Sequence, residues 1–98
     1  MSFDKYADAL REIEGLAKVN PGELKIDLQR IATVGKRVGE ELLAGIITPE
    51  QAAGNFEDLT RAARARLQAQ ALTVAAAAQG IKWFDVALTA LRVVKVVL

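Results

Sequence analysis

The chain has 98 residues, of which 52% are hydrophobic, 26% are charged and 5% are aromatic, and its formal net charge is +1. This length suits one domain with a modest core, and the composition excludes a disordered chain. The balanced charge disfavours a protein that binds nucleic acid mainly by neutralising phosphates.

The first predicted helix covers residues 3–19, where apolar side chains recur every three or four positions. This spacing places them in one stripe along a helix. The stripe consists of Phe3, Tyr6, Leu10, Ile13 and Ala17.

The second predicted helix covers residues 21–44. Asn20 as N-cap and Pro21 at the first helical position indicate its start. Its apolar stripe consists of Leu24, Leu28, Ile31, Gly35, Val38 and Leu42. Gly35 and Gly39 lie four residues apart, so they either allow another backbone to approach closely or are tolerated on the surface.

The third predicted helix covers residues 49–79. Gly45 is a typical residue after a helix end, and the sequence Thr-Pro-Glu-Gln at residues 48–51 predicts a capping box. The apolar face consists of Phe56, Leu59, Ala63, Leu67, Ala71, Val74 and Ala78. Residues 69–79 are rich in alanine, which favours a helix, and Gly80 predicts the break that follows.

The last predicted helix covers residues 81–98 and is highly apolar. Its polar side chains are Lys82, Asp85, Thr89, Arg92 and Lys95. Residues 93–98 are rich in β-branched side chains, so a strand is the alternative there. We therefore predict an all-α fold, a small bundle of about four helices in antiparallel hairpins, and a single domain over residues 1–98.

The apolar surface of residues 81–98 is too large to remain in water. Burying its ten sizeable side chains contributes roughly 15–30 kcal/mol of gross transfer free energy. The surface can be buried against the chain itself, another protomer, a protein partner or a lipid surface. We predict an association element, with an interface formed by Trp83, Phe84, Leu88, Leu91, Val94 and Val97.

A membrane span is not expected, because residues 86–98 are too few and include Arg92 and Lys95. A helix lying on the membrane surface stays an alternative, since Trp83 and the net charge of +2 over residues 81–98 suit one. The start of the chain lacks the basic and apolar pattern of a signal peptide, so we expect a cytoplasmic protein.

Catalytic chemistry has few candidates in this chain. It has no cysteine and no histidine, and Ser2 is its only serine. Disulfides, thiol chemistry, the usual zinc sites and a Ser-His-Asp arrangement are therefore excluded. We expect no enzyme, no cofactor and no metal site.

The basic residues suggest a second alternative. Lys36, Arg37, Arg61 and Arg64 could form one face of a helix-turn-helix. The acidic residues Glu50, Glu57 and Asp58 on the same helix would repel phosphate, so an ion-paired surface is favoured over nucleic-acid contact.

The sequence thus predicts a non-enzymatic helical protein for interaction or assembly, which forms a homo-oligomer or binds a protein partner through its last helix. The alternatives are a regulatory module that binds nucleic acid and a peripheral membrane protein. Short length and a simple helical pattern are typical of small accessory proteins of bacteria and their phages, and no motif in this chain narrows the function further.

Overall fold

The computed structural model describes residues 2–20, 22–70 and 75–97, and side chains for residues 3–20, 22–69 and 78–92. Over the described residues the chain forms four α-helices. These are α1 (Ser2–Val19), α2 (Gly22–Leu43), α3 (Pro49–Gln70) and α4 (Ala75–Val97). The predicted all-α bundle of about four helices is confirmed.

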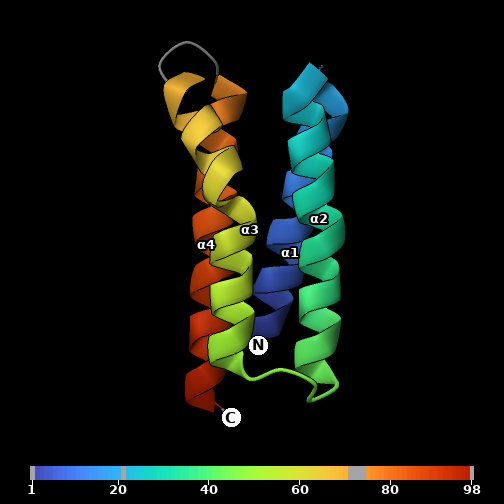
Figure 1. The fold of residues 1–98 in the computed structure, drawn as a ribbon, viewed down its shortest axis with the longest axis vertical. Helices are drawn as coiled ribbons and strands as arrows, with labels where there is room; N and C mark the ends of the chain where they lie inside the picture. Colours follow the sequence, from blue (N-terminus) through green and yellow to red (C-terminus); the bar gives the residue numbers. More distant parts are fainter. Residues whose placement is uncertain (1, 21, 71–74, 98) are drawn as a thin grey trace.

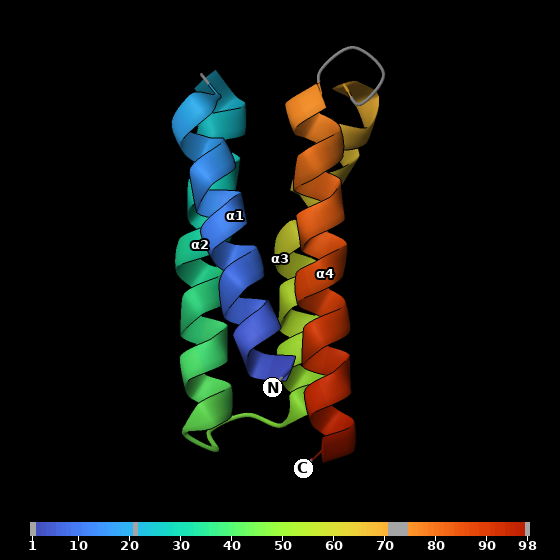
Figure 2. The same cartoon turned by 180° about the vertical axis from the view of Figure 1, so that it is seen from behind.

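The helices run alternately up and down in a bundle of 40 × 21 × 19 Å (Figure 1). α1 packs against α2 and α4, and α3 packs against the same two helices, so neighbouring helices form a closed ring. The α2–α3 turn, the start of α1 and the end of α4 lie at one end of the bundle, here called the turn end (Figure 2). The end of α1, the start of α2, the end of α3 and the start of α4 lie at the opposite end.

The core forms where the apolar stripes of the four helices meet. In α1, the predicted stripe is confirmed, because Tyr6, Leu10, Ile13 and Ala17 are buried and Phe3 is partly buried against them. The largest fully buried side chains in the other helices are Leu28, Ile31, Phe56, Leu67, Phe84 and Leu91.

The connection between α1 and α2 differs from the prediction. The Asn20 side chain does not cap α2; its Nδ2 donates a hydrogen bond to the carbonyl oxygen of Leu16 at 2.7 Å. Asn20 therefore completes the end of α1. Gly22, the first residue of α2, has a φ of +67°, a conformation that glycine adopts at low cost. The described part of α2 begins at Gly22, and the predicted helix start at Pro21 lies outside the described residues.

The α2–α3 turn agrees with the prediction bond by bond. The Ile46 amide donates to the carbonyl of Glu41 and the Gly45 amide donates to that of Leu42, which is a Schellman motif with Gly45 at φ +74°. The capping box follows, since the Thr48 amide donates to Gln51 Oε1 at 2.8 Å and the Gln51 amide to Thr48 Oγ1 at 3.1 Å.

The predicted boundary between the last two helices is wrong. α3 ends at Gln70 and α4 begins at Ala75, so Gly80 lies inside α4 instead of breaking the chain. Gly80 is buried, and a Cβ there would lie 3.1 Å from Leu67 Cδ1. The alanine-rich segment favours helix throughout and contains no local stop signal, so packing decides where the helices end. Ala71 and Val74, predicted on the face of α3, lie outside the described residues.

The glycine pair of α2 is buried and lies against the side chains of α1. A Cβ at Gly35 would lie 2.9 Å from Leu10 Cδ2, and one at Gly39 would lie 3.0 Å from Tyr6 Cε2. The Tyr6 hydroxyl donates a hydrogen bond to the carbonyl oxygen of Gly35 at 2.5 Å. The surface alternative for this pair is wrong because both glycines are buried, and the atoms that approach them belong to side chains instead of another backbone.

Candidate interaction surfaces

The predicted interface of the last helix is largely used inside the chain. Phe84 and Leu91 are fully buried, Leu88 is 9% exposed, and Trp83 is partly buried against the core. The side chains of Val94 and Val97 lie outside the described ones, so their part in an interface stays a prediction. α4 is helical to Val97, which removes the strand alternative for residues 93–97.

The sequence left open whether this apolar surface is buried against the chain itself. The structure shows that it is, for the apolar face of α4 as far as Leu91. This face packs against α1 and α3, the two neighbours of α4. Trp83 also has a polar neighbour, since the Lys82 ammonium lies 5.1 Å from its ring centre. A cation over an indole ring stabilises both groups at the surface.

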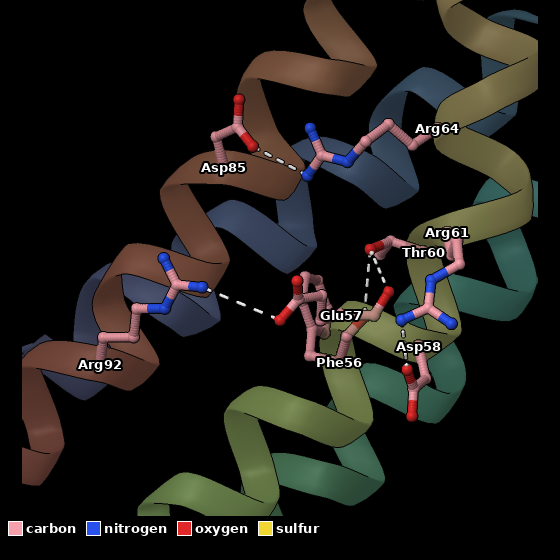
Figure 3. Close-up of polar contacts among 8 residues, drawn as sticks. All are labelled: Phe56, Glu57, Asp58, Thr60, Arg61, Arg64, Asp85 and Arg92. Atoms are coloured by element: carbon pink, nitrogen blue, oxygen red, sulfur yellow. Dashed lines mark hydrogen bonds and ion pairs between the residues drawn. The ribbon is translucent and has the colours of Figure 1, made fainter.

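The polar stripe of α4 faces acidic and basic side chains of α3 (Figure 3). Arg64 on α3 forms an ion pair with Asp85 on α4 at 2.8 Å, and Arg92 on α4 lies 3.8 Å from Glu57 on α3. The Arg64 guanidinium also lies 5.9 Å from the centre of the Phe84 ring. Part of the polar stripe of α4 is thus an ion-paired seam between helices.

The four basic residues predicted for nucleic-acid contact do not come together on one surface. Arg64 is directed towards α4, and Arg61 pairs with Asp58 of its own helix at 2.8 Å. Lys36 instead lines a groove between α1 and α2, on another side of the bundle. Arg37 is exposed on α2. This arrangement gives no continuous basic face.

Two shallow grooves follow the helix pairs. The larger, about 490 Å³, lies between α1 and α2 and is lined by Glu14, Lys18, Gln29, Ala32, Thr33 and Lys36. The smaller, about 280 Å³, lies between α2 and α3 and is lined by Glu23, Ile26, Asp27 and Arg66. Both are open and carry charges of both signs, so neither resembles an enclosed pocket for a small molecule.

One interhelical contact in the smaller groove was not predicted from the sequence. Arg66 Nε on α3 donates to Asp27 Oδ2 on α2 at 2.7 Å. This hydrogen bond, with the carboxylate charge, raises the pKa of Arg66. The two residues are 39 positions apart, and no local spacing could have revealed the pair.

Among the described side chains, the large apolar ones that are exposed form two pairs, one near each end of the bundle. Leu43 and Ile46 are 68% and 69% exposed at the turn end, and Val19 and Ile26 are 75% and 64% exposed towards the other end. Single exposed apolar residues are common on protein surfaces. The turn-end pair differs because it lies at the same end as residues 93–97, the apolar last part of α4 (Figures 1 and 2).

Other kinds of site have little support among the residues that the structure describes. No group of three acidic side chains is placed to hold a metal ion. Across the described helices, none is both long and apolar enough to cross a membrane. Comparisons with protein families, curated proteins and solved structures found no match to the chain.

Proposed function

We propose that the chain is a non-enzymatic assembly protein that associates with a second copy of itself through the turn end of the bundle. The observation that supports this most is the exposed pair Leu43 and Ile46, which lies at the same end of the bundle as the apolar residues 93–97 of α4. Apolar residues gathered in one area are typical of an interaction site, whereas scattered ones are not.

Of the interface predicted from the sequence, the proposal keeps only the residues at the end of α4. Phe84, Leu88 and Leu91 stabilise the monomer, so they are not free to bind a partner without opening the bundle. Val94 and Val97 remain in the proposed interface, together with Leu43 and Ile46. A formal net charge of only +1 also means that two copies repel each other weakly.

The first experiment measures the molar mass of the chain by light scattering over a range of concentrations. The wild type is expected to form a multimer, and Leu43→Lys/Ile46→Lys is expected to shift it to a monomer, because two charges then enter the proposed contact. Lysine at the last residue of α2 also suits the helix dipole, so the fold should be retained. Leu91 is a poor target, because a charge at this buried position would unfold the bundle.

The control is Val19→Lys/Ile26→Lys, which adds the same two charges at residues that are as exposed but lie towards the other end. Its molar mass should equal that of the wild type. A wild type that is monomeric at every concentration would contradict the proposal, and so would equal dissociation by both pairs of substitutions.

A further inference from the structure

The seam between α3 and α4 contains two ion pairs in one register. Glu57 and Arg64 lie seven residues apart on α3, and Asp85 and Arg92 lie seven residues apart on α4 (Figure 3). Because the helices are antiparallel, the same register brings Arg64 to Asp85 and Glu57 to Arg92. The polarity is reversed between the two pairs, since α3 contributes the base to one and the acid to the other.

The apolar pattern opposes a displacement in one direction only, where Lys95, seven residues after the buried Leu88, would take its place. Buried side chains of α3 recur seven residues apart, as in Phe56 and Ala63, and those of α4 do the same, as in Phe84 and Leu91. A heptad repeat keeps apolar positions facing each other when one helix moves by seven residues. The alanine-rich end of the hairpin contains no stop signal that would oppose such a displacement.

The charges do oppose the displacement. Moving α4 by one heptad in one direction places Arg64 opposite Arg92, and moving it in the other direction places Glu57 opposite Asp85. Both alternatives lose two attractive pairs and gain a repulsive one, and the second also brings Glu50 opposite Arg92, which restores one attractive pair. We infer that the reversed polarity of the two ion pairs sets the register of α3 against α4 and excludes pairings displaced by one heptad.

The test makes the polarity uniform without removing either pair. In Arg64→Glu/Asp85→Arg, both native pairs remain attractive, but α3 then carries only acids and α4 only bases at these four positions. A pairing displaced by one heptad therefore becomes attractive as well. At the strength of exposed ion pairs, the displaced population should rise about tenfold relative to the native register.

The register can be measured by the distance between two spin labels, because the chain contains no cysteine of its own. Gln68→Cys on α3 and Thr89→Cys on α4 replace exposed residues, and a displacement of one heptad moves the labels about 10 Å along the helix axis. The wild-type charges are expected to give one distance, and the uniform-polarity variant two.

The matched control reverses both pairs, as Glu57→Arg/Arg64→Glu/Asp85→Arg/Arg92→Glu. It contains both substitutions of the test variant but keeps alternating polarity, so it should give a single distance. The swap Glu57→Arg/Arg92→Glu also makes the polarity uniform and keeps Arg64 over Phe84; it should give two distances. A single distance in both uniform-polarity variants, or two distances in the alternating control, would overturn the inference.

Discussion

The α1–α2 seam and the α3–α4 seam hold their helices together in different ways. In the first, Tyr6 enters a recess that Gly35 and Gly39 leave on α2, and its hydroxyl bonds the Gly35 carbonyl. In the second, Gly80 lets α4 approach Leu67, and ion pairs lie along the exposed edge.

The two seams differ in what fixes the register of one helix against the other. A large ring in a matching recess has one favourable position, and displacement would leave both the recess and the hydroxyl unsatisfied. In the second seam, most apolar positions at heptad spacing still face each other after a displacement, and the contact of Leu67 with Gly80 is the exception. The first seam is thus specified by buried shape, and we infer that the second needs charges to reach the same specificity.

The largest effect is expected from filling the recess of the first seam. Gly35→Val should destabilise the fold by about 3 kcal/mol, because its Cβ alone would lie 2.9 Å from Leu10 Cδ2 and 3.3 Å from Phe56 Cε1. Chemical denaturation measures this free energy of unfolding.

The control for this substitution is Gly54→Ala in α3, where a Cβ meets nothing within 4 Å. It should stabilise the protein by about 0.5–1 kcal/mol, since alanine favours a helix more than glycine does. Stabilisation by Gly35→Val would show that no recess is needed.

A smaller effect is expected from the Tyr6 hydroxyl. Tyr6→Phe should cost about 1 kcal/mol, the usual net contribution of one hydrogen bond, because the ring itself stays in place. Thermal or chemical unfolding of the two proteins measures the difference. No loss of stability would show that the ring alone specifies the seam.

The same hydroxyl predicts a dependence on pH. Burial raises the pKa of Tyr6 in the folded protein, whereas the unfolded value is about 10. The contribution of Tyr6 to stability is therefore fully present below pH about 10 and is lost as the pH rises from there through the folded pKa. Because Tyr6 is the only tyrosine, phenolate absorbance follows it directly, and Tyr6→Phe should show a smaller loss of stability in this range.

The smallest effect is expected from the ion pairs of the second seam. A double-mutant cycle with Arg64→Gln and Asp85→Asn should give a coupling free energy of about 0.2–1 kcal/mol, because the carboxylate is largely exposed. This coupling should fall at high salt. A much larger coupling would mean that the pair stabilises the seam as well as selecting its register.

Local signals in the sequence predicted the fold well wherever the structure itself is local. The capping box at Thr48 and the glycine at position 45 use bonds between residues a few positions apart, so the α2–α3 turn could be read directly. Asn20 was assigned to the wrong helix because its side chain can cap either neighbour, and the left-handed Gly22 decides between them.

The sequence failed where contacts between helices decide the outcome. Gly80 looked like a break, but a buried glycine that faces Leu67 and a glycine that ends a helix have the same local signature. For the candidate interaction surface, the apolar character of α4 was clear, yet which of its residues the chain buries depends on the stripes of α1 and α3. The Arg66–Asp27 and Arg64–Asp85 pairs likewise required the assembled bundle.

The contact between α1 and α4 closes the ring of helices, and this has a consequence for chain connectivity. Since α1 starts and α4 ends at the same end of the bundle, a short linker could join them without crossing the core (Figure 2). A circular permutant opened between α3 and α4 would then keep all four helix pairings and every bond of the α2–α3 turn. The order of the helices in the chain is therefore one of several that this packing could accept.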